Sequence, residues 1–472
     1  MKMNKKKSAV LMAMMVVLSA GLCGCSNNNE EARMVQIGTS DKEFRFGCYS
    51  TPYYENIGDV PYAEHPDQNT YENWKNIADC GFNYAIPIND VTHDQIIKTL
   101  TRAQEQGMKV LIMDYLSSGL PQLIKRSENK SYEEVYASIL QMEDTLIRRY
   151  TEYATYSSFA GIQVFDEPAA SFYNAIAAGQ DWWYEHFPQY EYYVNLLPSY
   201  SSYVQLFGAS AENGYKYPEY VEQFVEKSNP SYISYDHYPF IRSGISATIR
   251  PQYLYDLEVF AEASKKYEIP FYCYQLCTKH LSYPELTSYR EYAWQAYTAM
   301  AYGCQGLQTF KYWAYMSPEV NSLNLGNGLV DRDGNITSFY YAVQEVNREI
   351  KSFEEYYMNF TWEGTMPIGP SGAGAYALLR FPMKSLYGVK KVSASEDTII
   401  GQFRDKWNNK AYMVVNYSSP YRNVSTEVTM HFENVKKVLI CKKGRQILQN
   451  VENNTLKMTL GSGEGYFVIP VL

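Results

Sequence analysis

The sequence predicts a (β/α)8 barrel followed by a C-terminal antiparallel β-sandwich. Eight short apolar or aromatic runs alternate with segments of helical periodicity over residues 43–355, the pattern of a parallel barrel. No GxGxxG turn follows the first run, which disfavours a dinucleotide-binding sheet. From residue 356 onward, short alternating strands separated by turn residues replace the helical pattern. Two domains also suit 472 residues, since a single core stops growing near roughly 250–300 residues.

The N-terminus has the pattern of an export signal. Four early lysines precede the apolar run "AVLMAMMVVLSAGL", and "LCGC" then ends at Cys25. This resembles a bacterial lipobox, which implies a signal peptide over 1–25 and lipidation of Cys25. A transmembrane anchor is the alternative, but a span needs about 20 apolar residues. Residues 26–42 are polar and aperiodic and predict a flexible tether, with the protein lipid-anchored in the bacterial cell envelope and facing outside the cytoplasm.

The charge balance argues against nucleic acid as a partner. The formal net charge is −9, and cleavage before Cys25 would remove four lysines and no acids, giving −13. Such a chain lacks the basic surface that phosphate backbones require, so a neutral ligand is expected. Six further cysteines show neither CxxC pairing nor histidines at zinc-like spacing. We therefore expect buried thiols, no metal site and no cofactor.

Each element of the barrel has its own signal. The helical segments carry independent start and stop signals, with capping boxes at "THDQ" (92–95) and "SYEE" (131–134) and a C-terminal glycine at Gly107. The predicted strands, in chain order, span 44–50, 82–88, 109–115, 159–165, 192–198, 232–238, 269–276 and 306–313.

Reactive residues of a parallel barrel collect at the C-terminal ends of its strands. The candidates there combine carboxylates, amides and aromatic rings. They are Tyr49, Asn89, Asp90, Asp114, Tyr115, Asp166, Glu167, Tyr200, Asp236, His237, Tyr238, Gln275, Lys311 and Trp313.

This mixture of groups suits a carbohydrate. Aromatic faces stack on the apolar face of a sugar ring, while carboxylates and amides bond its hydroxyls. Hydrolysis also needs one carboxylic acid to protonate the leaving oxygen. Glu167, in "FDEP", is the expected acid, and Asp166 is expected to bind a hydroxyl or to tune the pKa of Glu167.

With "FDEP" on strand four, "ISYDHYPF" on strand six, "GLQTFKYW" on strand eight and the trailing β-domain, the chain resembles the clan A glycoside hydrolases, especially β-galactosidase-like members. The resemblance implies an acid/base Glu at the end of strand four, usually after Asn, and a nucleophilic Glu at the end of strand seven. Glu167 matches the first position, with Asp166 in place of Asn. Gln275 stands where the nucleophile belongs, and a neutral amide cannot form the glycosyl ester.

Three interpretations stay open. Asp236 or Asp114 could activate water in an inverting reaction, or the acetamido group of the substrate could attack while Asp166 orients it, as the Asp-Glu pairs of some hexosaminidases suggest. The third is a glycan-binding lipoprotein without catalysis. We expect an O-glycoside hydrolase acting on plant or host oligosaccharides, with glycan binding alone as the alternative.

Several of these residues also have structural explanations. Asp166 and Glu167 could be solvated acids at a helix start. His237 could form a local hydrogen bond with Asp236, and Lys311 could form an ion pair with Glu167 or Asp236. Trp313 could pack against its neighbours at the rim of the barrel. The 47 tyrosines mostly fall on helices, where packing against the barrel is expected. The C-terminal domain carries no cluster of acids or histidines, so we expect a structural or carbohydrate-facing role for it.

Overall fold

A computed structural model describes most of the chain after the N-terminal segment. The described residues are 37–53, 67–88, 92–114, 116–209, 214, 216–244, 246–314, 326–370 and 376–471. The signal peptide with Cys25, most of the tether, and the candidate residues Asn89, Asp90 and Tyr115 lie outside them.

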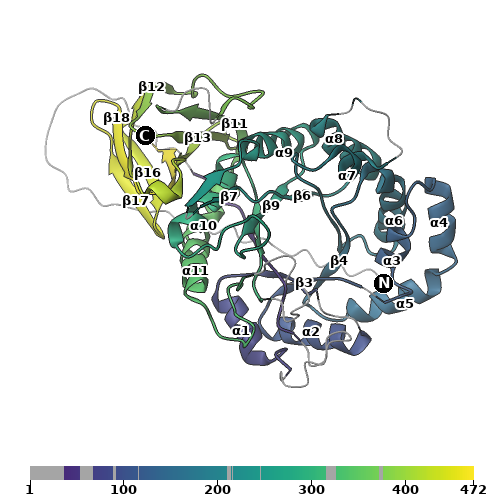
Figure 1. Cartoon of the computed structure of the whole chain (residues 1–472). Coiled ribbons are helices and arrows are strands. Elements are labelled where there is room, and N and C mark those ends of the chain that lie inside the picture. Colours follow the sequence, from purple (N-terminus) through teal and green to yellow (C-terminus); the bar gives the residue numbers. More distant parts are fainter. Residues whose placement is uncertain are drawn as a thin grey trace, which may run out of the picture. The chain divides into compact units, whose positions relative to one another are not determined.

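Eight parallel strands form the expected barrel (Figure 1). Their hydrogen-bonded order is β5-β4-β3-β2-β1-β10-β9-β6, and a parallel bridge between Leu196 and Tyr235 joins β5 to β6 and closes the ring. The barrel strands are β1 (Arg45–Tyr49), β2 (Tyr84–Ile86), β3 (Lys109–Ile112), β4 (Phe159–Asp166), β5 (Glu191–Asn195), β6 (Ile233–Asp236), β9 (Phe271–Leu276) and β10 (Gly306–Phe310). Each falls within, or within a residue of, a predicted run.

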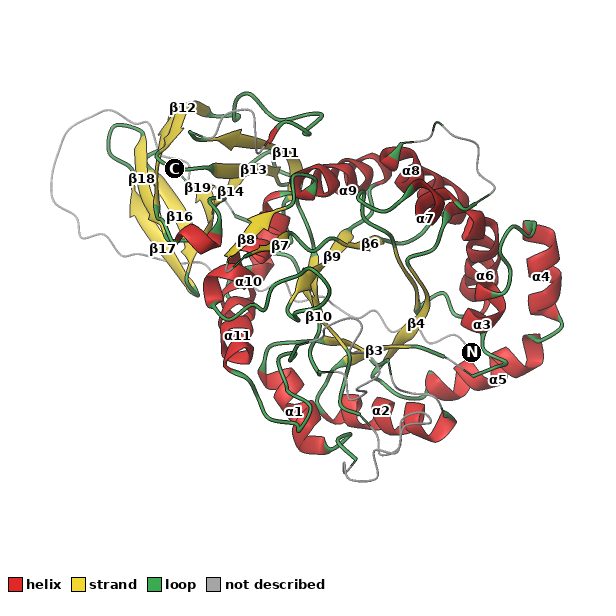
Figure 2. Cartoon of the chain, viewed as in Figure 1, coloured by secondary structure: helices red, strands yellow, loops and turns green. Residues whose placement is uncertain are grey.

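Helices surround the strands (Figure 2). They are α1 (Tyr71–Asp79), α2 (His93–Glu105), α3 (Leu120–Lys125), α4 (Tyr132–Leu140), α5 (Glu143–Tyr153), α6 (Tyr173–His186), α7 (Tyr203–Phe207), α8 (Tyr217–Ser228), α9 (Tyr253–Tyr267), α10 (Tyr289–Ala301), α11 (Ser338–Lys351) and α12 (Glu354–Tyr357). Both predicted capping boxes form, with Thr92 and Ser131 as N-caps. Gly107 has φ +68°, as expected for a glycine after a helix end.

One element of the barrel had no sequence signal that we recognised. After β6 the chain forms a hairpin of β7 (Phe240–Ser243) and β8 (Ser246–Ile249), paired antiparallel, before α9 begins. Each strand has only four residues, and short strands of this kind look like loop in a sequence. The hairpin lengthens the loop at the C-terminal end of strand six, where the site is expected.

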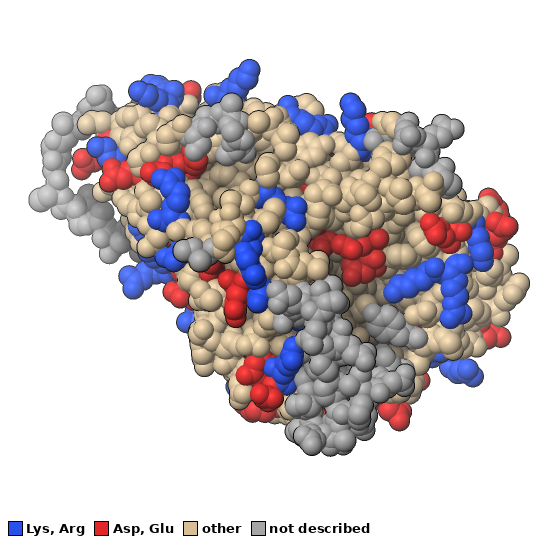
Figure 3. All heavy atoms as spheres, viewed as in Figure 1, with Lys and Arg blue, Asp and Glu red and all other residues tan. Residues whose placement is uncertain are grey.

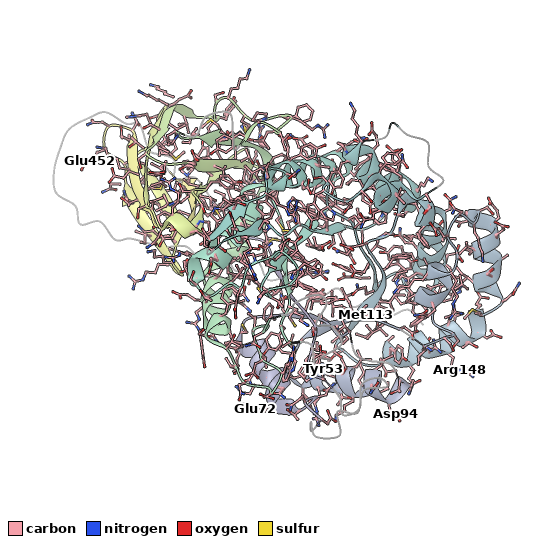
Figure 4. The ribbon with its side chains drawn as sticks, in the orientation of Figure 1. Tyr53, Glu72, Asp94, Met113, Arg148 and Glu452 are labelled. Carbon is pink, nitrogen blue, oxygen red and sulfur yellow. The ribbon has the colours of Figure 1, made fainter. Side chains whose placement is uncertain are left out.

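Side chains fill the barrel and the space beneath its helices (Figure 4). In Figure 4, Glu72, Asp94 and Arg148 project from the outer helices into solvent. Many tyrosines are buried where helices pack against strands, among them Tyr150, Tyr173, Tyr220 and Tyr253, so packing explains much of the tyrosine excess. The six cysteines among the described residues are buried free thiols. None of the helices in the described ranges combines the length and apolar character that a membrane span needs.

The C-terminal part consists of two antiparallel sheets, ordered β11-β13-β14-β19-β16-β17 and β12-β15-β18. Their buried side chains form a separate apolar core, as expected of a sandwich. The strands are β11 (Thr361–Ile368), β12 (Val389–Ala394), β13 (Thr398–Arg404), β14 (Lys410–Asn416), β15 (Thr426–Phe432), β16 (Lys437–Lys442), β17 (Arg445–Asn450), β18 (Thr455–Leu460) and β19 (Gly465–Pro470).

The structure corrects one part of this prediction. The sequence suggested a Gly/Pro-rich connection beginning "GTMPI", but residues 361–368 are strand β11, which pairs along its length with β13. Pro367 is tolerated because β11 is an edge strand of its sheet, where one side needs no backbone donor.

Candidate active site

A cavity of about 310 Å³ opens at the C-terminal end of the barrel. Three of the predicted acids line it: Asp166 and Glu167 at the end of β4, and Asp236 at the end of β6. Figure 3 shows acidic atoms gathered in a hollow near the middle of the face in view. The structure therefore brings together the three residues that the sequence proposed as catalytic.

The backbone at Glu167 is held in an unusual conformation. Its φ is +56°, in the left-handed region that costs a residue with a side chain roughly 1–2 kcal/mol. Two hydrogen bonds fix the turn: Glu167 N donates to the Asn195 carbonyl (2.8 Å), and Tyr220 OH donates to the Pro168 carbonyl (2.7 Å). Such strain persists where the surroundings enforce it, and here it places the Glu167 side chain on the cavity wall.

Asn195, at the end of β5, connects the acids of β4 and β6. Its Nδ2 donates to Asp166 Oδ1 (3.3 Å) and to Asp236 Oδ1 (3.1 Å). Its Oδ1 accepts from Ser234 Oγ (2.9 Å), which fixes the orientation of the amide. The amide group of Asn195 thus donates to both carboxylates and holds these two carboxylates on one side of the cavity.

The Ser234 hydroxyl belongs to a buried polar network inside the barrel. Gln308 Nε2, from β10, donates to Ser234 Oγ (2.9 Å) and to Tyr193 OH (2.7 Å). Tyr193 and Ser234 are themselves hydrogen-bonded at 2.7 Å. Because these groups are buried and satisfied, they form a rigid support beneath Asn195.

Glu167 and Asp236 interact closely enough that each carboxyl group shifts the pKa of the other. Loss of hydration and the charge of Asp166 raise the pKa of Glu167 to about 7, although the hydrogen bond with Asp236 opposes this. Loss of hydration and the charge of Glu167 raise the pKa of Asp236 well above its usual range. At neutral pH the pair therefore keeps a proton that it can donate.

Asp166 is the third member of the acid group. Loss of hydration raises its pKa, against the opposing effects of Asn195 and Lys125. Asp166 and Glu167 are nevertheless open to solvent through the mouth of the cavity, since both residues are exposed. Water therefore screens part of their interaction.

Aromatic rings form much of the remaining wall. Tyr49, Tyr238, Tyr274 and Phe310 line the cavity, with Tyr49 and Phe310 centroids 5.5 Å apart. At the rim, the Arg250 guanidinium lies 3.9 Å from the centre of the Tyr200 ring and donates to Tyr283 OH (3.2 Å). The Tyr200 and Tyr283 hydroxyls are 3.0 Å apart. The predicted binding residues Tyr49 and Tyr238 thus share the cavity with the acids.

Two predicted polar residues lie away from this cavity. Asp114 is fully buried, and its Oδ2 accepts from Arg149 Nη1 (3.0 Å) and Tyr150 OH (2.9 Å). His237 is also buried, and its Nδ1 lies 2.7 Å from Asp256 Oδ2 rather than bonding Asp236. Neither side chain lines the cavity, so the structure does not present them to a ligand there.

The same holds for three residues of strands seven and eight. Gln275 is buried and donates to Cys273 Sγ (3.1 Å), while its neighbour Tyr274 lines the cavity instead. Side chains alternate along a strand, so only one of two neighbours can face inward. Lys311 and Trp313 are buried outside the cavity wall. Burial and the charge of Arg332 lower the pKa of Lys311.

Sequence reasoning missed several lining residues, including Asn195, Tyr274, His280, Tyr283 and Phe310. Asn195 and Phe310 end the observed strands β5 and β10, but the predicted runs extended to residues 198 and 313, so the strand-end rule passed over both. Tyr274 could have been found by considering the side chains on both faces of strand seven. His280 and Tyr283 lie in the loop after β9, where no local pattern distinguishes a side chain that folds back over the barrel.

Comparison with models of known protein families finds no match, and neither does comparison with curated proteins. Among solved structures, one described as a glycoside hydrolase has a TM-score of 0.51 at 10% identity, over 93% of this chain and 96% of that chain. An α-amylase from Anoxybacillus has a TM-score of 0.49 at 8% identity, over 91% and 98%. A family 39 glycoside hydrolase from the gut symbiont Bacteroides cellulosilyticus WH2 has a TM-score of 0.45 at 10% identity, over 91% and 81%.

At such low identity a likeness of this kind concerns the fold. The structural neighbours are glycoside hydrolases, and the likeness at TM-score 0.51 covers nearly the whole of both chains. The chain therefore shares the fold of that structure, and its (β/α)8 barrel with a C-terminal β-sandwich is the architecture that the sequence resemblance implied.

Proposed function

We propose that this protein is an O-glycoside hydrolase acting on oligosaccharides, with Glu167 as the general acid. The observation that carries the proposal is the grouping of Asp166, Glu167 and Asp236 in an open cavity at the C-terminal end of the barrel, where their surroundings raise the pKa of Glu167. General acid catalysis at neutral pH needs a carboxyl group that is still protonated there, and a pKa of about 7 meets this requirement.

The cavity wall supports a sugar as the ligand. Both rings and carboxyl groups line it, so that one molecule could stack on Tyr238 or Phe310 while its hydroxyls reach Asp166 or Asn195. Its volume of about 310 Å³ is at the lower end of ligand pockets, which span about 300–1,000 Å³. This favours recognition of a small part of an oligosaccharide at a time.

The roles of the three acids follow from their positions. Glu167 donates its proton to the glycosidic oxygen. Once that proton has left, Asp236 accepts a hydrogen bond from a second donor. Asp236 lies too close to Glu167 to serve as the opposing base, since the carboxyls of inverting enzymes are about 6.5–9.5 Å apart. Asp166 keeps the pKa of Glu167 high and is placed to bind a hydroxyl group.

Sugar release from a panel of oligosaccharides tests the proposal. Wild type is expected to release sugar, whereas Glu167→Gln binds the same oligosaccharide, measured by calorimetry, without releasing it. Asp181→Asn is a suitable control, because Asp181 accepts from Tyr132 OH on an exposed surface far along α6. Equal release by wild type and Glu167→Gln would contradict the assignment.

Glycan binding without catalysis remains the second candidate, and one observation favours it. The end of β9 presents Tyr274 to the cavity rather than a carboxylate, so the described part of strand seven supplies no nucleophilic Glu. A wild-type protein that binds oligosaccharides tightly and never releases sugar from them would establish this function.

We further propose that the protein is attached to the outside of the bacterial cytoplasmic membrane or envelope through a lipid on Cys25. The support is the lysine-rich start, the short apolar run and the "LCGC" sequence. In a bacterial host, Cys25→Ser is expected to abolish incorporation of labelled palmitate and to move the protein out of the membrane fraction. Palmitate labelling of the Cys25→Ser variant would contradict this proposal.

A further inference from the structure

His280 is a cavity residue that the proposed acid chemistry does not use. It belongs to the loop after β9 and lines the same cavity as Asp166, Glu167 and Asp236. In the closed barrel, β6 and β5 lie between β9 and β4. His280, which follows β9, and Glu167, which follows β4, therefore approach the cavity from well-separated sides.

The backbone fixes which nitrogen of His280 carries a proton. Nδ1 lies 2.8 Å from the Thr278 carbonyl oxygen, and a carbonyl only accepts, so Nδ1 is the donor. In neutral imidazole this leaves Nε2 as the acceptor. Thr278 is fully buried, and its hydroxyl accepts from Lys311 N (3.2 Å), so the anchor of the ring is itself fixed.

The surroundings keep the imidazole neutral. Burial lowers the pKa of His280, the Thr278 carbonyl opposes this, and the charge of Lys311 lowers it further. The other groups against the ring are Tyr283, Phe310 and Tyr238, with centroids 4.5, 5.2 and 5.4 Å away. Arg250 donates a hydrogen bond to Tyr283 OH and so adds a second positive charge near the imidazole. No carboxylate contributes to the shift of His280, so it is not the partner of an acid.

The loop itself is strained where it meets the cavity. Leu281, next to His280, has φ +46° although it is not glycine, and its side chain is 54% exposed at the cavity mouth. A leucine in this region costs roughly 1–2 kcal/mol, and burial of its side chain does not offset that cost. This marks the loop as one that holds His280 over the site.

We propose that His280 is the general base that activates the hydrolytic water, on the side of the anomeric carbon opposite Glu167, and that the reaction inverts the anomeric configuration. The inference rests on the proposed hydrolase function. Water oxygen bonds to the anomeric carbon as its proton passes to Nε2. The glycosidic bond breaks as Glu167 gives its proton to the departing oxygen. A solvent-mediated proton transfer from His280 back to Glu167 restores both groups.

The first test is the anomer released. Proton NMR during the first turnovers of wild type on an oligosaccharide of known linkage is expected to show the inverted anomer, before mutarotation. The retained anomer would overturn the inference. If retention also required a 2-acetamido group on the substrate, attack by the substrate itself would replace it.

The second test removes the base. His280→Ala is expected to lower kcat by about 100-fold or more with little change in KM, and to remove the acidic limb of the pH profile of kcat/KM. Sodium azide, which needs no base, is expected to restore turnover and give an inverted glycosyl azide. His280→Asn, which can still bond the Thr278 carbonyl, repeats the test if the alanine variant does not fold. His93→Asn on α2, with an exposed side chain, is the matched control.

The outcomes separate this inference from the hydrolase function. Sugar release by wild type but not by Glu167→Gln, with His280→Ala within threefold of wild type, would overturn the role of His280 alone. A third result would be loss of activity in Asp90→Asn that azide restores, together with normal activity in His280→Ala. That result would assign the role of general base to the loop after strand two. Absence of sugar release by wild type would overturn the hydrolase function, and this inference with it.

Discussion

The two ends of the barrel both contain charged side chains in protected positions, but they stabilise them differently. At the N-terminal end Arg45 Nη2 bonds Glu191 Oε1 at 2.5 Å, and the guanidinium lies 4.1–4.2 Å from the ring centres of Tyr84 and Tyr272. Burial tends to lower the pKa of Arg45, but Glu191 and the surrounding tyrosines raise it overall. Each charge at this end has an opposite charge beside it.

At the C-terminal end like charges meet instead. Asp166, Glu167 and Asp236 stand together, connected by the neutral amide of Asn195, and the pKa of each is raised. Paired opposite charge contributes to holding the barrel together, whereas grouped like charge holds a proton ready for transfer. The difference supports the proposal that the C-terminal end is the catalytic end of the barrel, because grouped like charges there cost stability.

The largest expected difference between the two ends is in activity. Glu167→Gln is expected to lower kcat/KM by about 10²–10⁴-fold on substrates with poor leaving groups, because general acid catalysis is lost. Its melting temperature should equal or exceed that of wild type, since the amide removes one of three like charges. Paired turnover assays and thermal melts check this, and a large drop in melting temperature would contradict the comparison.

Breaking the Arg45–Glu191 pair at the N-terminal end should instead lower stability and leave activity unchanged. Glu191→Gln is expected to lower the free energy of unfolding by about 3 kcal/mol, because it leaves Arg45 buried beside a neutral partner. The kcat of the folded fraction should be unchanged. Chemical denaturation of Glu191→Gln, of the double variant Arg45→Met/Glu191→Leu and of the surface control Lys75→Ala measures this. A double variant as unstable as the single one would argue against a charge effect.

A smaller change should come from Asp166→Asn. The charge of Asp166 raises the pKa of Glu167, so its removal lowers that pKa below its wild-type value of about 7. The proton needed for catalysis is then lost at lower pH, and the basic limb of kcat/KM moves toward acid. A pH profile of kcat/KM against that of wild type tests the direction, and an unchanged basic limb would show that another group controls it.

The smallest expected effect is on stability as a function of pH. The folded protein raises the pKa of Glu167 from 4.5 to about 7, so between these values it binds more protons than the unfolded chain. This contribution is complete below the lower value and is lost as pH rises through the upper one. Melting temperatures at pH 5 and pH 8 should therefore differ less in Glu167→Gln than in wild type. Equal differences would mean that solvent screens the shift entirely.

Local sequence was enough to locate the barrel and its site. Apolar runs alternating with helical segments predicted eight strands in their right places, and the rule that strand ends carry chemistry brought forward Asp166, Glu167, Asp236, Tyr49 and Tyr238. These features depend on short-range periodicity and on the direction of parallel strands, which a sequence expresses directly.

Long-range contacts decided the rest. Asp114 follows strand three as a candidate should, but Arg149 and Tyr150 of α5 take up its carboxylate. Strand seven offered both Tyr274 and Gln275, and only the closed barrel settled that the tyrosine faces the cavity.

What the sequence by itself determined is the order of strands and helices and the position of an acid at the end of strand four. Only the tertiary structure decided that Glu167 and Asp236 meet in one cavity and shift each other's pKa, that Asn195 holds the acids together, and that His280 lies over the same cavity. The physical reason is that pKa values depend on separations of a few ångströms between residues far apart in the chain, which barrel closure sets and no local pattern encodes.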